Sequence, residues 1–215
     1  MQKLFQRGLS SKAGHDGSEM QPNERKKPWP NRKMKRTNVI LLRGVTPTGK
    51  NRVPMADLRS ALADAGFVDV QTYIQSGNAI VKTAMQQAEV ETFVHNVIKR
   101  RIGADITVLA RTPSQLGGIL KNNPFPSADP SKLYFTILSD QPNQKLIDTL
   151  FEINFSPDKI EIIGDTIYTL YATKHSDSKF NNNSFERKIK VAATTRNFNT
   201  MTSLVKMSRK DILFD

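Results

Sequence analysis

The sequence contains no cysteine among its 215 residues. This absence excludes disulfide bonds, thiolate metal sites and cysteine nucleophiles, and it is typical of proteins in a reducing compartment. No apolar run approaches the roughly 18–20 residues that a membrane-spanning helix needs. We therefore expect a cytoplasmic protein that has no membrane partner.

Histidine is also scarce. The three histidines are His15, His95 and His175, and none has a partner at metal-ligand spacing or a nucleophile pattern beside it. We therefore predict no metal site and no cofactor. Whether the chain is an enzyme stays open, because the candidate segments described below hold a single acidic residue, Glu186, for acid–base work.

The positive charge is concentrated at the N-terminus. The formal net charge is +12, and residues 1–36 hold ten Lys and Arg against three acidic residues. This segment has too few apolar residues to offset the entropic cost of ordering its backbone, so we predict a disordered basic tail over residues 1–36. The tail is either an arm for nucleic acid, in which Trp29 stacks on bases, or an extension that precedes a true start at Met34.

The body of the chain begins with strand and helix patterns in the order β-α-β-β-α-β. The apolar run at residues 38–45 predicts a buried strand that ends at Gly and Pro. Ser76-Gly77-Asn78 predicts a tight turn between two later strands. The predicted strands are 38–45, 68–74, 78–83 and 106–110, and the predicted helices are 54–66 and 88–102.

The same rhythm returns after a linking helix at residues 113–121. We predict strands at 133–138, 159–163 and 166–172, a short strand or turn at 193–197, and helices at 144–153, at 182–189 and from residue 199. The fold class is therefore α+β, with two ferredoxin-like halves in a duplicated arrangement, residues 37–112 and 113–215. A single larger α/β sheet is the alternative, because the last quarter of the chain is weakly patterned.

A first candidate segment follows the first strand and reads G-x-x-x-x-G-K-N, close to a phosphate loop. Asn51 stands where such a loop needs a hydroxyl for Mg²⁺, and Pro54 delays the helix whose N–H groups would cradle phosphate. We expect no nucleotide hydrolase here. The segment instead suits a looser anion site built from Arg43, Lys50, Asn51 and loop amides, or else it is a turn with a solvated lysine.

A second candidate segment is the hairpin tip at residues 73–78. Gln75, Ser76 and Asn78 can hold a polar ligand there. They are also residue types that a tight turn selects, since Gly and Asn accept a positive φ.

A third candidate segment lies between residues 178 and 200. Asn182 and Glu186 are one helical turn apart and share a face. An arginine among hydroxyl and amide groups before the last helix can receive phosphate or carboxylate. The alternative is that Glu186 pairs with Arg196 and the polar residues cap the helix. The candidates in this segment are Lys179, Asn182, Glu186, Arg196 and Asn197.

These segments together resemble one bacterial family. LLRGVTPTGKNRVPM and the hairpin YIQSGN are similar to the opening of the domain-of-unknown-function 1697 family, and SKFNNNSFERKIKVAATTRNFNT is similar to its C-terminal motif. The resemblance covers about residues 37–205, includes every candidate residue above, and implies an α+β protein with ferredoxin-like halves. The family has no assigned activity. This chain departs from it at Pro47, which removes an amide donor, and at Phe198, where Trp is common.

We expect the three segments to meet and to bind an anionic or phosphorylated ligand, either a small molecule or nucleic acid. Residues 38–45 and 78–83 contain no aromatic side chain, so a standard RNA-recognition sheet is not expected. One alternative is a small-molecule enzyme in which Lys179, Glu186 and Arg196 act by electrostatic positioning. Another is a structural or assembly module in which the polar motifs hold loops. The sequence does not indicate an oligomeric state.

Overall fold

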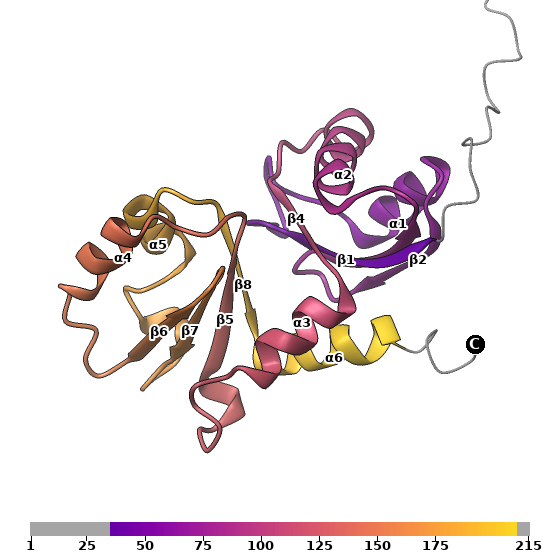
Figure 1. The fold of residues 1–215 in the computed structure, drawn as a ribbon. Helices are drawn as coiled ribbons and strands as arrows, with labels where there is room; N and C mark the ends of the chain where they lie inside the picture. The colour runs from indigo at the N-terminus through magenta and orange to yellow at the C-terminus, as the bar shows by residue number, and fades with distance from the viewer. Residues whose placement is uncertain (1–34, 210–215) are drawn as a thin grey trace, which may run out of the picture. The chain divides into compact units, whose positions relative to one another are not determined.

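The structure is a computed structural model that describes residues 35–209, with the elements labelled in Figure 1. Apart from Lys35 and Arg36, the predicted disordered tail over residues 1–36 lies outside this range. The described residues form two four-stranded antiparallel sheets and six α-helices. We call β1 to β4 with their helices the first half, and β5 to β8 with theirs the second half.

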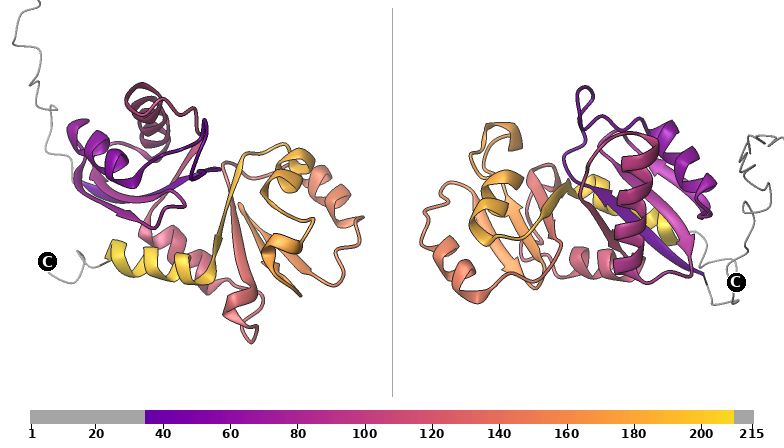
Figure 2. Two further views of the ribbon diagram at one scale, coloured as in Figure 1. Left: turned by 180° about the vertical axis from the view of Figure 1, so that it is seen from behind. Right: turned by 90° about the horizontal axis from the view of Figure 1, so that it is seen from above.

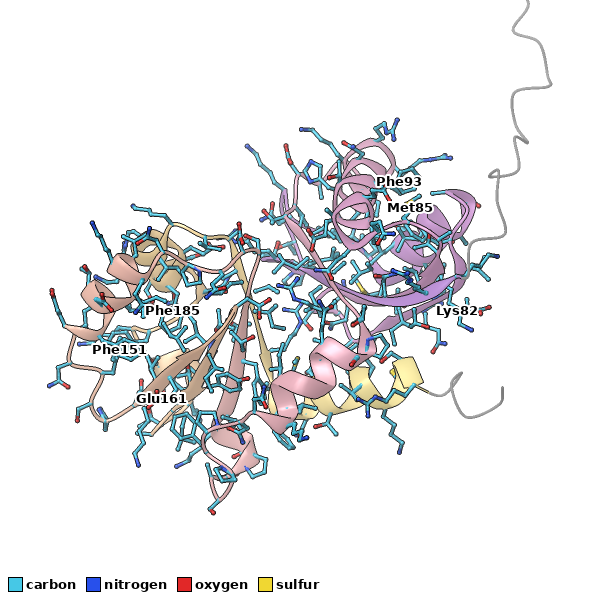
Figure 3. All side chains as sticks on the ribbon, viewed as in Figure 1. Lys82, Met85, Phe93, Phe151, Glu161 and Phe185 are labelled. Atoms are coloured by element: carbon cyan, nitrogen blue, oxygen red, sulfur yellow. The ribbon has the colours of Figure 1, made fainter. Side chains whose placement is uncertain are left out.

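The first half has the strand order β2-β3-β1-β4. Its strands are β1 (Arg36–Leu42), β2 (Val68–Tyr73), β3 (Asn78–Thr83) and β4 (Val108–Arg111), and its helices are α1 (Met55–Asp64) and α2 (Gln87–Arg101). One face of the sheet packs on these helices through side chains such as Ile40, Leu58 and Val94. Met85 and Phe93 pack against this core from its margin (Figure 3).

The second half has the strand order β6-β7-β5-β8. Its strands are β5 (Leu133–Leu138), β6 (Lys159–Ile163), β7 (Thr166–Leu170) and β8 (Ala193–Asn197), and its helices are α4 (Gln144–Phe151) and α5 (Asn182–Ile189). Leu138, Ile167 and Phe185 belong to the core between sheet and helices (Figure 3 labels Phe185). Two helices lie outside this pattern, α3 (Pro113–Lys121) between the halves and α6 (Phe198–Arg209) after the second.

A third core joins the two halves. It contains Val39 and Leu41 from β1, Phe135 from β5, Leu116 from α3 and Leu204 from α6. Because side chains alternate along a strand, β1 sends Val39 and Leu41 to this core and its other apolar side chains to the helix side. Both faces of β1 are therefore buried, which explains its unbroken apolar run.

The predicted element order is the observed one. The single-sheet alternative is wrong, because the described strands form two separate sheets. The prediction that Arg36 belongs to a disordered tail is wrong, because Arg36 begins β1 and pairs with Thr83 of β3. β1 ends at Leu42, earlier than predicted, because Gly44 takes a φ of +67° and turns the chain out of the sheet. Residues 193–197, predicted as a strand or turn, form a strand that pairs with β5. In the described part of the chain, no helix has the length and apolar character to cross a membrane.

Candidate functional site

The loop after β1 contacts α5 of the second half through one arginine. The Nε of Arg43 donates to Oε1 of Glu186 at 2.5 Å, and its Nη2 donates to Oε2 of the same carboxylate and to Oδ1 of Asn183 at 3.1 Å. This bidentate ion pair raises the Arg43 pKa, chiefly through the hydrogen bond with Glu186. The first and third candidate segments therefore meet.

The carboxylate of Glu186 is held in place by α5 and β8. The side chain of Asn181 caps α5 by accepting from the N–H of Ser184 at 3.2 Å. Asn182 then donates to the carbonyl of Ala193 at 2.6 Å, and the N–H of Ala193 donates to Glu186 at 2.6 Å. These bonds fix one face of α5 on the start of β8 and aim Glu186 at Arg43.

Arg196 in β8 is buried and links the second half to the first. Its Nε donates to Oδ1 of Asn78 at 2.6 Å, and its Nη2 donates to the carbonyls of Leu42 at 2.9 Å and Gly77 at 3.0 Å. Its Nη1 donates to the hydroxyl of Thr194 and to the carbonyl of Thr195, both at 2.8 Å. Burial lowers the pKa of Arg196 to about 10, and within residues 35–209 no carboxylate forms an ion pair with it.

The hairpin between β2 and β3 supplies several of the acceptors for Arg196. Asn78 is fully buried and donates to the carbonyl of Tyr73 at 3.0 Å and to the hydroxyl of Ser76 at 3.2 Å. Gln75 donates to the carbonyl of Val53 at 3.0 Å, which ties the hairpin to the loop after β1. All three hairpin candidates thus form hydrogen bonds within the protein, although Gln75 and Ser76 are exposed and only Asn78 is buried.

The remaining candidates have separate positions. Lys50 is exposed, and Asn51 makes a long 3.4 Å hydrogen bond to the carbonyl of Gly44 within its own loop. Lys179 is exposed, with its Nζ 5.3 Å from the centre of the Phe180 ring. Asn197, at the far end of β8, accepts from the N–H of Thr200 and caps α6.

The suggested pair of Glu186 with Arg196 is wrong, since Glu186 pairs with Arg43 and Arg196 binds neutral acceptors. The Nε, Nη1 and Nη2 donors of Arg196 all have acceptors within the protein, so Arg196 is not free to receive a ligand in this conformation. Arg43 uses its Nε and Nη2 for Glu186 and Asn183. Asn183 belongs to the site although it is not among the candidate residues predicted from the sequence. Its position three residues before Glu186 on a helix face is the signal that could have identified it.

Exposed cations lie on the two segments that the Arg43–Glu186 pair joins. Arg187 lies one turn after Asn183 on α5, and Lys190 lies one turn after Glu186, while Lys50 and Arg52 lie in the loop that Arg43 begins. All four side chains are exposed, and in the part of the chain that the structure describes none forms an ion pair. We call Lys50, Arg52, Arg187 and Lys190 the basic surface. Figure 2 shows the loop projecting beyond the end of β1.

The arrangement offers little for metal chemistry. Among residues 35–209 there is no group of three or more His, Asp or Glu side chains placed to hold a metal ion. What the site presents to solvent is positive charge on two segments, one from each half, held together by a bidentate ion pair.

Comparison with known proteins places the chain in a family. The model of the family described as "Protein of unknown function (DUF1697)" matches residues 34–168, more than half of the sequence, so the protein belongs to that family. The matched range ends before the third candidate segment, whose resemblance to the family's C-terminal motif stays a prediction. A search of curated proteins gave no match.

One similar solved structure is the conserved bacterial protein SP0830 from Streptococcus pneumoniae. It superposes with a TM-score of 0.62 at 21% sequence identity, over 81% of this chain and 99% of that chain. At this identity the likeness concerns the fold alone.

Proposed function

We propose that the protein binds an anionic, phosphate-bearing ligand at the basic surface, and that a nucleic-acid strand is its ligand. The observation that carries this proposal is that the two segments which Arg43 joins carry four exposed cations without ion pairs among the described residues. Unpaired lysines and arginines release counterions from a polyanion when they bind it, which favours association at moderate salt.

The charge of Arg196, which joins β8 to the first half, supports the same proposal. Arg196 is a buried cation with only neutral acceptors among the described residues, so its charge is not cancelled locally. A cation in a low-dielectric interior projects its field toward the nearby surface. Glu186 offsets Arg43 alone, and the pair leaves the surrounding cations free to attract an anion.

The form of the surface favours an extended ligand over a small one. Lys50 and Arg52 are exposed in a loop, Arg187 is exposed on α5 and Lys190 is exposed at the C-cap of that helix, so none of the four is enclosed in a pocket. A strand of nucleic acid can contact such charges one phosphate at a time. A cytoplasmic location, which we also propose from the cysteine-free composition, would give the protein access to such strands.

We further propose that each half is a ferredoxin-like unit and that the two arose by duplication. The element order β-α-β-β-α-β and the sheet orders β2-β3-β1-β4 and β6-β7-β5-β8 support this proposal. In many such units the open sheet face binds RNA. Here side chains such as Leu41 and Phe135 bury those faces in the core between the halves, so binding would use the loop and α5 instead.

The alternative that the protein is a small-molecule enzyme gains no support from the site. Glu186 already accepts from Arg43 and from the N–H of Ala193, and the donors of Arg196 are occupied. A purely structural module accounts for the bonds of Arg196 and Asn78, but it gives no reason for the unpaired cations beside them.

The proposal is tested by fluorescence anisotropy with a labelled single-stranded DNA of about 20 nucleotides. The quadruple variant K50Q/R52Q/R187Q/K190Q should bind this DNA about tenfold more weakly than the unchanged protein, or more weakly still, because each phosphate contact contributes to affinity. The same measurement on a shortened protein that begins at Met34 distinguishes binding by the basic N-terminal segment from binding by the basic surface.

A matched control removes the same amount of charge elsewhere. R101Q/K121Q/K145Q/K206Q replaces four exposed cations on α2, α3, α4 and α6. This control should lower the affinity for the DNA much less than K50Q/R52Q/R187Q/K190Q does. Equal losses in the two variants would show that net charge alone determines binding, and the proposed surface would have to be abandoned.

A further inference from the structure

A pocket opens in the second half at the beginning of β5. Its walls include Ser131, Lys132 and Tyr134 on one side and residues 172–177 on the other, and its volume is about 650 Å³. This volume lies within the range of about 300–1,000 Å³ that small-molecule sites occupy. No sequence motif pointed to this pocket.

Aromatic rings form part of the pocket wall. The rings of Tyr134 and His175 stack with their centres 4.7 Å apart and an interplanar angle of 11°. Tyr171 lies edge-on to both, at 5.2 Å from Tyr134 and 5.1 Å from His175. The hydroxyl of Tyr171 donates to the carbonyl of Phe180 at 2.7 Å and is buried, which fixes this ring and supports the other two. The hydrogen bond of Tyr171 thus orders the ring against which Tyr134 and His175 pack, and such ordering before a ligand arrives lowers the entropic cost of binding.

Cationic and hydroxyl groups surround these rings. Lys132 and Lys174 are both exposed and both line the pocket, and the Nζ of Lys132 donates at 3.1 Å to the carbonyl of Ala172, another residue of the lining. The one carboxylate of the lining, Asp177, accepts from the hydroxyl of Ser176 at 2.9 Å. Burial lowers the pKa of His175, so its ring is neutral at pH 7 and adds ring surface rather than charge. The lining thus combines two ammonium groups with a flat apolar wall.

We propose that this pocket binds a nucleoside monophosphate, with the phosphate between Lys132 and Lys174 and the base against the Tyr134–His175 rings. An ammonium pair with nearby hydroxyls suits a phosphate dianion. A planar base gains from contact with aromatic surface, because every base has a face that can stack on a ring.

This pocket is separate from the basic surface. Tyr134, in the pocket wall, is the second residue of β5. The basic surface lies toward the other end of this strand, where the last residue, Leu138, pairs with Ala193, the residue that binds α5. The inference therefore goes beyond the proposed binding of nucleic-acid strands, and each can fail without the other.

The test titrates the full-length protein with adenosine monophosphate, ribose 5-phosphate and adenosine, and follows histidine side-chain resonances by NMR. Adenosine monophosphate should shift the resonances of His175 and leave those of His95 unchanged. It should bind at least tenfold more tightly than either fragment, because the fragments lack the base or the phosphate.

Two variants assign the phosphate contact. K132Q/K174Q and the single variant K174Q should each weaken binding of adenosine monophosphate, by tenfold or more for the double variant, while the distant K145Q/K206Q should not. Lys174 makes no side-chain hydrogen bond or ion pair within the described residues, so K174Q keeps the test valid if loss of the Lys132–Ala172 bond disturbs the fold. The proposal is overturned if ribose 5-phosphate binds as tightly as adenosine monophosphate, or if neither lysine variant weakens binding.

Discussion

Arg111 and Arg196 hold matching positions in the two halves, each donating to a backbone carbonyl of the other half. Arg111 ends β4 and donates to the carbonyl of Leu138, the last residue of β5. Arg196 lies in β8 and donates at 2.9 Å to the carbonyl of Leu42, the last residue of β1. The two halves are thus joined by reciprocal arginines, each placed in the fourth strand of its own half.

The match extends to the hairpins. The N–H of Leu42 donates to the carbonyl of Gly77 at 2.8 Å, and the N–H of Leu138 donates to the carbonyl of Asp165 at 2.9 Å. The Nη2 of Arg111 also donates to Oδ2 of Asp165 at 2.9 Å, and its Nη1 lies 3.7 Å from Oε1 of Glu91. Arg196 has no such acid among the described residues. One junction is therefore neutralised and the other keeps its positive charge.

Replacing Arg196 by lysine should strongly destabilise the protein. A lysine keeps the charge but cannot supply donors to Asn78, Leu42 and Gly77 together, so buried acceptors lose their partners. Since a hydrogen bond to a charged group contributes about 1.5–3 kcal/mol, we expect Arg196→Lys to lower the free energy of unfolding by at least about 3 kcal/mol. Urea denaturation followed by circular dichroism measures this.

The exposed Arg187 provides the control for this measurement. Arg187→Lys changes the same chemical group at a position without buried partners, so it should alter the unfolding free energy by no more than about 0.5 kcal/mol. A similar small effect for Arg196→Lys would contradict the role of Arg196 as the link between the halves.

Gly77 is required by both conformation and space. It has a φ of +85°, and a Cβ there would come within 2.6 Å of Val45 Cγ2 and 2.8 Å of Leu42 Cβ. Gly77→Ala should therefore destabilise by more than the roughly 1–2 kcal/mol of left-handed backbone alone. Gly103 has a φ of +82° with open space around it, so Gly103→Ala measures the backbone cost by itself. Equal losses in melting experiments would refute the close approach of Gly77 to β1.

Much of the fold could be predicted because it follows from local patterns. The Gly-containing hairpin at 76–78 and the apolar run of β1 mark their elements directly. The roles of the polar motif residues could not be predicted in the same way. Whether Glu186 faces Arg43 or Arg196 depends on how α5 packs on β8 and on which strand ends meet, and this is long-range information that no local pattern contains.

The pocket and the reciprocal arginines were missed for a related reason. Lys132 and His175 are 43 positions apart and neither lies in a recognisable motif; β5 and the segment after β7 bring them together. The match between Arg111 and Arg196 has no counterpart in the sequence, because the halves repeat in element order rather than in residue identity.

The ion pair between Arg43 and Glu186 should show measurable coupling. A double-mutant cycle with Arg43→Met and Glu186→Gln isolates the pair, and we expect a coupling energy of about 1 kcal/mol, because the pair is bidentate but partly exposed. Each single variant is measured by urea denaturation. Strictly additive effects would mean that the loop after β1 does not depend on α5 for its position.

His175 should make the protein less stable in mild acid. Its pKa in the folded state lies below the ordinary value of 6.5 because burial disfavours the charged ring. As the pH falls below 6.5 the unfolded chain takes up the proton first, so stability falls until the folded pKa is reached, by no more than about 1.4 kcal/mol per pH unit. His175→Phe keeps a ring beside Tyr134 and should lose less stability than the unchanged protein between pH 7.5 and 5.0. An identical pH dependence in the two proteins would show that His175 titrates normally.

The salt dependence of binding tests the proposed function most directly. For the chain that begins at Met34, we would measure the slope of the logarithm of the association constant for single-stranded DNA against the logarithm of the salt concentration. Each phosphate contact with a single strand contributes about 0.7 to this slope, so the variant K50Q/R52Q/R187Q/K190Q should show a slope smaller by up to about 3. An unchanged slope would mean that these four cations contact no phosphate and that the basic surface is not where the ligand binds.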